Sequence, residues 1–480
     1  MVRRVDKQCI RSIVPVNIST TLYDHQRTAV EKLLTVRVGG LFMEMGTGKT
    51  LSAIELVSRR QDKISNVVWF CPVGLKSTID FELRKHTDCQ SIYVFDDKTN
   101  MQNVPDSLWY IIGIESMSSS DRMVLTANAL INENSFVIVD ESSYIKGHDS
   151  LRTKRITLMS ERAKYRLILT GTPMSQGVVD LYAQMRFLSS KILGYNSFYS
   201  FAHNHLEYSE KYPGLIIRAH NTGLLASKIQ PYVYQVTKEE CLDLPDKLFD
   251  SRYFDMTYEQ SQFYQQAKDE ILLDIKDGEI DSYTIFRLFT ALQQITSGYW
   301  NHPRFRYEFQ HLRLETLCDI IKSIPQDKKI IIWCKFIYSI EHIIKKLHDE
   351  FGYDSVSCYY GKLGEKERDK EIEKFRNDAK FFVATMQTGG HGLTLNESHY
   401  VIFYENTFKY ADRLQAEDRC HRIGQPEKVT YIDIVCRSGI ERRIQESMTK
   451  KSNVIYEFKQ KIDKVKDMSK KNLERFVNEL

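Results

Sequence analysis

Two arginines three positions apart, Arg419 and Arg422, lie in the polar segment QAEDRCHRIGQ at 415–425. On a helix, this spacing places both guanidinium groups on one face. Near the other end of the chain, Lys49 follows Gly48 in a glycine-rich segment that is typical of phosphate binding. A phosphate-binding lysine and a distant arginine pair suggest one nucleotide held from two sides by separate lobes. This layout is typical of an ATP-driven motor.

The glycine-rich segment MEMGTGKT at 43–50 follows a predicted strand and opens a predicted helix, Leu51–Arg60. Glycines let the backbone wrap around phosphates, and the amino terminus of the helix points N–H groups at them. We expect Lys49 to reach the β- and γ-phosphates of ATP and the Thr50 hydroxyl to ligate Mg²⁺. The full phosphate-loop pattern has glycine where Met43 stands. The expected nucleotide contacts are Gly46, Thr47, Gly48, Lys49 and Thr50.

A second apolar run, Phe136–Val139, ends in two acids, Asp140 and Glu141. Taken alone, such an ending is more often an ordinary exposed edge. Between the glycine-rich segment and the LTGTP sequence at 169–173, it is typical of the second half of a phosphate-loop ATPase. Asp140 would hold the magnesium ion through water, and Glu141 would orient or deprotonate the attacking water.

The elements that must position these residues form two blocks, in which short β-branched or aromatic runs alternate with helical stretches. The strands predicted in the first block are Gly40–Met43, Val67–Cys71, Tyr110–Ile114, Phe136–Val139 and Tyr165–Thr170. Those predicted in the second are Lys329–Cys334, Ser355–Tyr360, Lys380–Thr385, Tyr400–Tyr404 and Val429–Val435. Unbroken apolar runs indicate strands buried on both faces. We therefore predict an α/β fold with two doubly wound parallel-sheet lobes.

Between the blocks, the sequence is rich in tyrosine and phenylalanine at helical spacing, which predicts helical insertions divided near Pro245. The predicted helices there include Leu181–Leu188, Tyr258–Ile275 and Tyr283–Gln294. The predicted domain limits are 1–175 for the first lobe, 176–243 for its helical insertion, 244–315 for a linker and the helical insertion of the second lobe, 316–445 for the second lobe and 446–480 for a basic helical tail.

Composition agrees with a soluble protein of 480 residues with a net charge of +4. From Glu441 to Leu480 there are 11 basic and 7 acidic residues, so this tail could contact phosphates, although a solvated helix surface explains it equally well. Nine cysteines without a C-x-x-C pair indicate neither a zinc site nor a disulfide framework. No apolar run approaches the ~20 residues of a membrane span, and no signal peptide is apparent. We expect a cytoplasmic protein without a membrane partner.

Taken together, these segments resemble a superfamily 2 helicase-type ATPase of the SWI/SNF branch over roughly residues 22–425. The segment 415–425 resembles the arginine-finger motif of this family, which implies catalytic roles for Gln415, Arg419 and Arg422. The segment around His25 resembles its adenine-reading motif, with Gln26 as the reader. The resemblance implies two RecA-like lobes, ATP and Mg²⁺ as cofactors, and DNA as the partner.

Other segments resemble the strand-contacting and coupling motifs of the family. The resemblance implies that Gly392 contacts ATP, and it gives the DNA-contact candidates Pro72, Ser116, Thr172, Thr385, Gly389 and Gly390. Contacts to phosphate predict a steep salt dependence and little base specificity. Trp300 and Phe336 could also stack on a base, although packing in the protein core is the more common role of such residues.

The chain departs from the family pattern at three positions. Ser142 and Ser143 follow the two acids, where the family has a small residue and a histidine, and Thr394 replaces an asparagine. The sequence of 392–395 (GLTL) together with that of 415–419 (QAEDR) looks closer to fork-remodelling and strand-annealing members than to nucleosome remodellers. A compact chain of this kind suits a prokaryote or a virus.

These features predict an ATP-dependent translocase that acts on duplex or branched DNA, such as forks and junctions. One alternative is a strand-separating helicase that acts on tailed duplexes. Another is a DNA-stimulated ATPase subunit whose protein partner completes a defence or remodelling complex. The sequence does not itself indicate such a partner.

Overall fold

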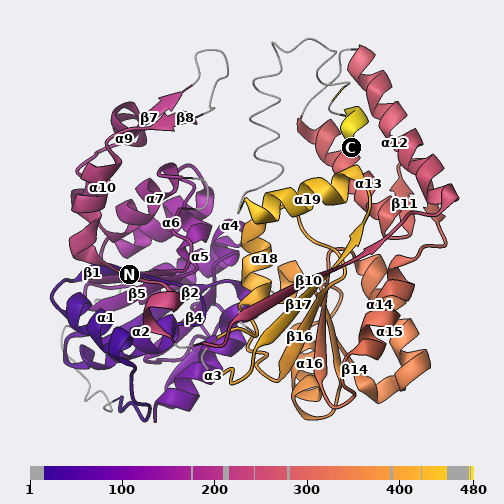
Figure 1. The fold of residues 1–480 in the computed structure, drawn as a ribbon. Helices are drawn as coiled ribbons and strands as arrows, with labels where there is room; N and C mark the ends of the chain where they lie inside the picture. Colours follow the sequence, from indigo (N-terminus) through magenta and orange to yellow (C-terminus); the bar gives the residue numbers. More distant parts are fainter. Residues whose placement is uncertain are drawn as a thin grey trace. The chain divides into compact units, whose positions relative to one another are not determined.

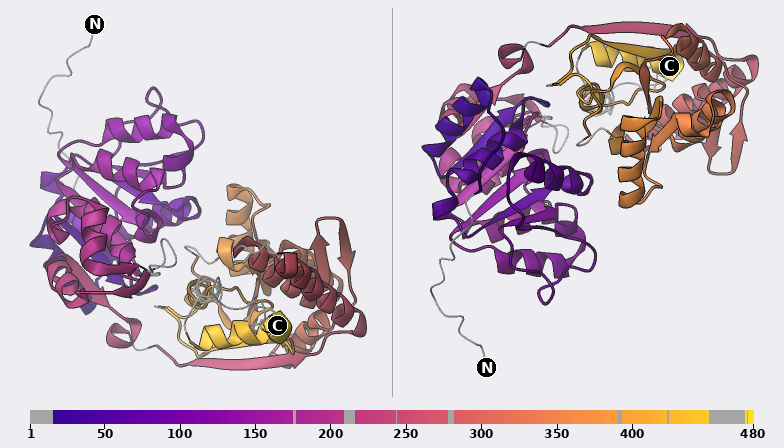
Figure 2. Two further views of the ribbon diagram at one scale, coloured as in Figure 1. Left: turned by 90° about the horizontal axis from the view of Figure 1, so that it is seen from above. Right: turned by 90° about the horizontal axis from the view of Figure 1, so that it is seen from below.

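The structure is a computed structural model that describes residues 16–174, 177–208, 216–242, 244–277, 282–389, 393–422, 424–450, 475 and 477–480, with the backbone alone at 274–277, 282–285 and 365. The described residues up to 242 form one compact unit, and those from 244 onward form a second. Each unit is built around a parallel sheet with helices on it (Figures 1 and 2).

Within the described residues, the main sheet of the first unit has seven strands in the order β3-β4-β2-β5-β6-β1-β9, all parallel. The strands are β1 (Val38–Met43), β2 (Asn66–Cys71), β3 (Ile92–Val94), β4 (Trp109–Gly113), β5 (Ser135–Asp140), β6 (Tyr165–Thr170) and β9 (Val233–Val236). Parallel neighbours need crossover connections, which the intervening helices supply.

The helices of the first unit cover both faces of this sheet. They are α1 (Asp24–Leu34), α2 (Lys49–Ser58), α3 (Lys76–His86), α4 (Ser116–Ser119), α5 (Asp121–Leu130), α6 (Leu151–Ser160), α7 (Val179–Leu188), α8 (Ser190–Leu193), α9 (Phe198–His205), α10 (Thr222–Ile229) and α11 (Lys238–Cys241). Short 3-10 helices lie at η1 (Gln61–Lys63), η2 (Val73–Leu75), η3 (Ser142–Ile145) and η4 (Gln230–Tyr232), and β7 (Leu206–Tyr208) pairs with β8 (Ile216–Ala219) in a hairpin.

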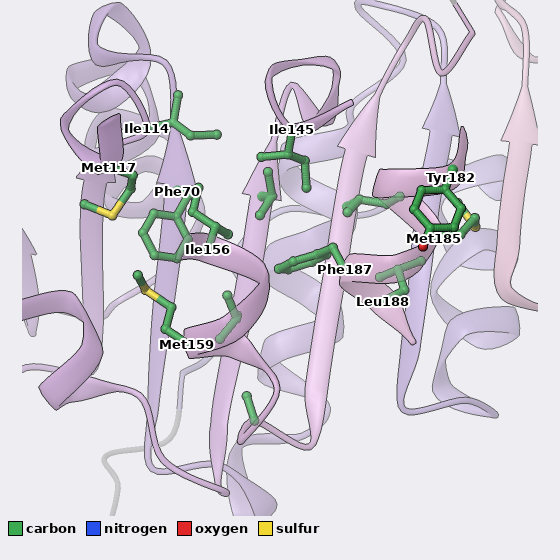
Figure 3. Close-up of a cluster of buried hydrophobic side chains, with 14 of the residues drawn as sticks. Phe70, Ile114, Met117, Ile145, Ile156, Met159, Tyr182, Met185, Phe187 and Leu188 are labelled. Atoms are coloured by element: carbon green, nitrogen blue, oxygen red, sulfur yellow. The ribbon is translucent and has the colours of Figure 1, made fainter. Parts of the chain in front are cut away.

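Strand β2 shows why both faces are apolar. Val68 and Phe70 point into one hydrophobic core, whereas Val67 and Trp69 point into the other, because successive side chains of a strand alternate between faces. Figure 3 shows part of the first of these cores, in which Ile156 and Met159 of α6 lie beside Phe70, and the labelled side chains of α7 belong to the same core. The alternation explains why the strand reads as a continuous apolar run.

Within the described residues, the main sheet of the second unit has six parallel strands in the order β10-β17-β16-β13-β15-β14. The strands are β10 (Lys247–Phe254), β13 (Lys329–Cys334), β14 (Val356–Tyr359), β15 (Phe381–Thr385), β16 (Ser398–Phe403) and β17 (Val429–Cys436). Ile330 and Ile332 point into one core, and Ile331 and Trp333 into the other. This sheet is therefore also buried on both faces.

The helices of the second unit include a separate helical body with a core of its own. The helices are α12 (Tyr258–Asp277), α13 (Ser282–Thr296), α14 (Arg313–Ser323), α15 (Ile337–Phe351), α16 (Glu365–Asn377), α17 (Met386–Gly389), α18 (Tyr410–Glu417) and α19 (Gly439–Thr449), with η5 (Tyr353–Ser355). A hairpin of β11 (Tyr299–His302) and β12 (Phe305–Glu308) packs with α12, α13 and α19. Trp300 is only 3% exposed in this core, so it packs rather than presenting a free stacking surface.

The predicted α/β class with two parallel sheets is confirmed, and all ten predicted strands are present with ends shifted by at most two residues. The strands that were not predicted are β3, β7, β8, β9, β10, β11 and β12. Of these, β7, β8 and β9 lie in the segment 176–243 that was expected to be a helical insertion, and β10, β11 and β12 lie in the segment 244–315 that was expected to be a linker and helices. The domain limits stay predictions. Residues 451–474 of the predicted basic tail lie outside the described residues. In the described part of the chain, no helix has the length and apolar character that crossing a bilayer demands.

Candidate functional site

The glycine-rich loop at 44–48 links the end of β1 to the start of α2 in the first unit. Gly46 and Gly48 have φ angles of 80° and 87°, in the left-handed region that other residues rarely adopt. A Cβ at Gly48 would also lie 1.9 Å from Nε2 of Gln26. The loop therefore requires glycine at this position, and it presents the amino terminus of α2 to an anion in the way that phosphate sites do.

Two side chains of α1 contact the glycine-rich loop. Nε2 of Gln26 donates to the carbonyl oxygen of Thr47 at 3.2 Å, and Nε2 of His25 lies 2.8 Å from the same oxygen. Oε1 of Gln26 accepts from the backbone N–H of Tyr23 at 3.0 Å. The structure thus brings Gln26 to the loop, while its contact with adenine stays a prediction. His25 was named from the sequence as part of the motif, without a role of its own, and the structure places it on the same carbonyl oxygen as Gln26.

Lys49 and Thr50 form the first turn of α2. Nζ of Lys49 donates to the carbonyl oxygen of Met43 at 2.9 Å and to that of Glu44 at 3.4 Å. The lysine side chain therefore folds back over the glycine-rich loop. If the loop held a nucleotide, the ammonium group would lie beside its phosphates.

Asp140 and Glu141 lie at the carboxyl end of β5. Burial raises the pKa of Asp140 from 3.8 to about 7, and the neighbouring Glu141 carboxylate adds to this increase. The positive charge of Lys49 acts in the opposite direction and lowers the pKa. The backbone N–H of Glu141 donates to Oδ1 of Asp140 at 2.9 Å. Glu141 has a φ of 48° and a ψ of 60°, a left-handed conformation that costs a residue with a side chain about 1–3 kcal/mol. Strain and a shifted pKa in adjacent acids are typical of functional sites.

The segment Thr170–Pro173 follows β6 and lies against the glycine-rich loop. A Cβ at Gly171 would be 3.3 Å from the backbone nitrogen of Met45, and the N–H of Thr172 donates to Oγ1 of Thr170 at 3.1 Å. Strands β5, β6 and β1 are neighbours in the sheet, so their carboxyl ends share one edge, where open α/β sheets bind ligands. The structure therefore brings together the predicted residues of the first unit.

Pro72 and Ser116 follow β2 and β4 at the same edge of the sheet. The N–H of Val73 donates to Oε2 of Glu115 at 3.0 Å, which joins the two segments. The Ser116 hydroxyl donates to the carbonyl oxygen of Gly113 at 2.5 Å. The structure places these two DNA-contact candidates next to each other, and their contact with DNA stays a prediction.

Arg419 and Arg422 lie in the second unit, beyond the end of α18. The expectation that they share one helix face is wrong, because α18 ends at Glu417 and the N–H groups of residues 419 and 420 donate to carbonyls only three positions back. Their guanidinium groups still converge, since Nη1 of Arg419 and Nη1 of Arg422 donate to the carbonyl oxygen of Leu393 at 3.1 and 3.3 Å. Nε of Arg419 donates to the carbonyl oxygen of Gln415 at 3.0 Å.

Thr385 is the last residue of β15, and Gly389 is the last residue of α17, which follows β15 directly in the second unit. Oγ1 of Thr385 accepts a backbone N–H of α17 at 3.3 Å. Gly389 is packed against an indole ring, because a Cβ there would lie 2.6 Å from the ring of Trp333. Gly390 and Gly392, the DNA and ATP contacts expected next, lie outside the described residues.

The SNF2-related domain family matches residues 25–305, which is more than half of the chain, and the Helicase conserved C-terminal domain matches residues 312–424. The chain belongs to the SNF2-related family. The first match includes the glycine-rich loop and the acids Asp140 and Glu141, and the second includes Arg419 and Arg422.

Among relatives of this SNF2-related chain is an uncharacterized ATP-dependent helicase of Mycoplasma pneumoniae, 25% identical over 455 residues, or 91% of this chain and 42% of the relative. The putative ATP-dependent helicase/translocase YwqA of Bacillus subtilis is 23% identical over 95% of this chain and 50% of its own. The DNA annealing helicase and endonuclease ZRANB3 of Mus musculus is 24% identical over 92% and 41%. The chain spans half or less of the length of these relatives.

Arg413, which sequence reasoning missed, holds α18 of this SNF2-related chain in place. Its Nε donates to Glu417 at 2.8 Å, and its Nη1 donates to Asn406 at 2.7 Å and to Asp433. The guanidinium lies 3.4 Å from the ring centroid of Phe403. The four-residue spacing of Arg413 and Glu417 was a usable signal, whereas the other partners come from distant segments and give none.

Thr50 and Asp140 are the residues that could hold a magnesium ion. No three His, Cys, Asp or Glu side chains gather into a metal-binding group anywhere in the described ranges. This donor set nevertheless fits Mg²⁺, which usually binds one or two carboxylates together with water and substrate phosphates rather than a cage made by the protein. The raised pKa of the Asp140 carboxyl group, caused chiefly by burial, also fits a site that a cation completes.

Proposed function

We propose that this chain hydrolyses ATP and couples hydrolysis to movement along duplex or branched DNA. One observation carries the proposal: the glycine-rich loop with Lys49, the acids Asp140 and Glu141, and the Thr170–Pro173 loop meet at one edge of one sheet. Membership of the SNF2-related family supports it. The names of the relatives, ATP-dependent helicase, helicase/translocase and DNA annealing helicase, support it as well.

Phosphoryl transfer requires positioning and charge neutralisation more than covalent chemistry from the protein. In the proposed mechanism, the loop N–H groups and Lys49 bind the phosphates, and Gln26 contacts the adenine. Glu141 accepts the proton of the attacking water. Arg419 and Arg422 supply positive charge to the γ-phosphate, a contribution of about 10³–10⁵ in turnover in related systems.

Thr50 and Asp140 would hold Mg²⁺ in this mechanism. When bound, the ion would neutralise negative charge on the phosphates. Burial favours the neutral form of Asp140, so the nearby Lys49 ammonium group helps to keep this carboxylate charged and able to act as a ligand.

DNA would be held mainly through its phosphates, because a protein that moves along DNA has to ignore base sequence. The proposed contacts are Pro72, Ser116, Thr172, Thr385, Gly389 and Gly390. The hydroxyl groups of Ser116, Thr172 and Thr385 and the backbone N–H groups of the two glycines would bind phosphate oxygens without reading bases, whereas Pro72 has no such donor. The name of ZRANB3, DNA annealing helicase and endonuclease, supports DNA as the substrate.

ATP hydrolysis rates with single-stranded, duplex and four-way-junction DNA at one salt concentration test the proposal. We expect duplex or junction DNA to stimulate hydrolysis. Glu141→Gln should abolish hydrolysis and leave ATP binding intact, because the amide keeps the shape of the side chain but cannot accept the proton. Stimulation by single strands alone, or hydrolysis that persists in this variant, would contradict the proposal.

A strand-separating helicase is the second candidate, which the relatives named ATP-dependent helicase favour. Both candidates use the same ATP site, so ATP hydrolysis alone does not separate them. A translocase should migrate a four-way junction and leave a simple tailed duplex paired, whereas a helicase should separate the tailed duplex. A partner protein that co-purifies in constant proportion would instead indicate a subunit of a larger complex.

A further inference from the structure

Gln184 is a buried amide on α7 that the proposed mechanism does not use. Its Oε1 accepts from the Ser142 hydroxyl at 2.6 Å, and its Nε2 donates to the carbonyl oxygens of Pro173 and Asp180, each at 2.8 Å. Carbonyl oxygens only accept, so the amide nitrogen has to face them, and Oε1 is left for Ser142. This bonding pattern fixes the orientation of the amide and makes Ser142 the donor.

The two ends of this bridge belong to two functional loops. Ser142 directly follows the strained Glu141 and begins η3. Pro173 ends the loop whose Gly171 lies against the backbone of Met45 in the glycine-rich loop. Gln184 therefore connects the turn that carries the second acid to the loop that touches the phosphate-binding segment.

Helix α7 also holds η3 through other contacts. Nζ of Lys146, at the end of η3, lies 3.6 Å from Oδ2 of Asp180. Ile145 belongs to the same hydrophobic core as the α7 side chains Tyr182, Met185, Phe187 and Leu188 (Figure 3). Helix α7 is therefore joined to η3 by a hydrogen bond, an ion pair and apolar packing.

Stability alone does not call for an amide at this position. Gln184 and Ser142 are both fully buried, and a buried amide lowers stability unless its hydrogen bonds are made. Replacing both members of such a pair by apolar groups of the same shape can be nearly neutral for stability. The pair is better explained by the orientation that its directional bonds impose.

We propose that Gln184 is a positioning residue for ATP hydrolysis, which fixes the Glu141 turn through Ser142 and ties it to the Thr170–Pro173 loop. The inference rests on the proposed ATPase function. Without the amide, the two loops can move independently of each other. ATP binding should be unchanged, because the glycine-rich loop and Lys49 keep all their contacts, while hydrolysis and its stimulation by DNA should fall.

Gln184→Met tests the proposal, because it keeps the length of the side chain and removes both the donor and the acceptor. We expect kcat for DNA-stimulated ATP hydrolysis to fall about tenfold or more, since a misplacement of about 1 Å can cost about a hundredfold. KM for ATP should stay within about twofold of wild type. Ser142→Ala should lower kcat in the same direction, and the double variant should lose no more than Gln184→Met alone.

Asn66 and Ser135 provide a matched control. They are the first residues of β2 and β5, at the ends of these strands away from the candidate site. The Ser135 hydroxyl donates to Oδ1 of Asn66 at 2.6 Å, and Nδ2 of Asn66 donates to the carbonyl oxygen of Leu130 at 2.9 Å. This pair has the same chemistry and is also buried. Ser135→Ala and Asn66→Leu should lower Tm while leaving kcat and KM unchanged.

The outcomes separate this inference from the proposed function. A Gln184→Met variant that binds ATP and keeps kcat within about twofold of wild type would overturn the positioning role, and so would an equal loss of kcat in the control variants. Absence of DNA-stimulated hydrolysis in the wild type would instead overturn the proposed function. If Gln184→Met does not fold, Ser142→Ala provides the test. A lower kcat with an unchanged KM for ATP would support the positioning role, and an unchanged kcat would overturn it.

Discussion

Gly48 combines two constraints in one residue of the glycine-rich loop, and Gly48→Ala should violate both. A φ of 87° disfavours alanine, and its Cβ would displace the Gln26 amide. The backbone cost is about 1–2 kcal/mol, so ATP binding measured with a fluorescent nucleotide should weaken about tenfold or more. Gly223→Ala is the control, because a Cβ at Gly223 meets nothing within 4 Å. Unchanged ATP affinity in Gly48→Ala would show that this loop does not bind the phosphates.

Among individual residues, those whose partners are close along the chain could be predicted from the sequence. Lys49 and Gly48 belong to one short motif, and the structure places Gly48 directly before α2 and Lys49 in its first turn. Arg419 and Arg422 do converge, although on the carbonyl oxygen of Leu393 rather than on a helix face. Gln184 could not be found from the sequence, because its hydrogen bond to Ser142 joins residues 42 positions apart.

Helix α18 depends on the buried ion pairs of Arg413, and Arg413→Leu should destabilise the second unit. The change would leave the charges of Glu417 and Asp433 poorly compensated in a site where Arg413 is 4% exposed. Breaking such a pair costs about 3–5 kcal/mol, which urea unfolding measures. Arg437→Leu, at an exposed pair with Asp255, should cost less than about 1 kcal/mol. Equal costs in the two variants would contradict a special role of the buried network.

Among the elements, buried strands were predictable and exposed strands were not. Strand β13 is a continuous apolar run, since both of its faces are covered. Strand β10 lies at the edge of the second sheet, and most of its side chains are at least partly exposed. Its pairing with β17 depends on residues about 180 positions away, so neither composition nor local periodicity identifies it as a strand.

Each unit as a whole is held together by contacts between segments distant in the sequence. In the second unit, the fully buried Arg313 donates to Glu441 at 2.7 Å and to the carbonyl oxygen of Ile434 at 3.2 Å. No local pattern pairs these positions. The fold class could be predicted because apolar runs and crossover helices are local features, whereas the buried polar network could be known only from the fold.

The stability of the second unit should fall on acidification because of His311. Burial, together with the positive charges of Arg313 and His342, lowers the pKa of His311 from 6.5 to about 4. Between these values the unfolded chain binds a proton that the folded chain does not, so stability is full above pH 6.5 and is lost as pH falls towards 4. A shift of this size corresponds to at most about 3.5 kcal/mol.

His311→Gln should remove this part of the pH dependence, because glutamine does not titrate. Urea unfolding of both proteins between pH 4 and 7 measures it, and the difference in unfolding free energy between wild type and variant should change steadily in favour of the variant as pH falls. If the unfolding free energy of His311→Gln depended on pH as steeply as that of the wild type, another group would be the one that binds the proton on unfolding.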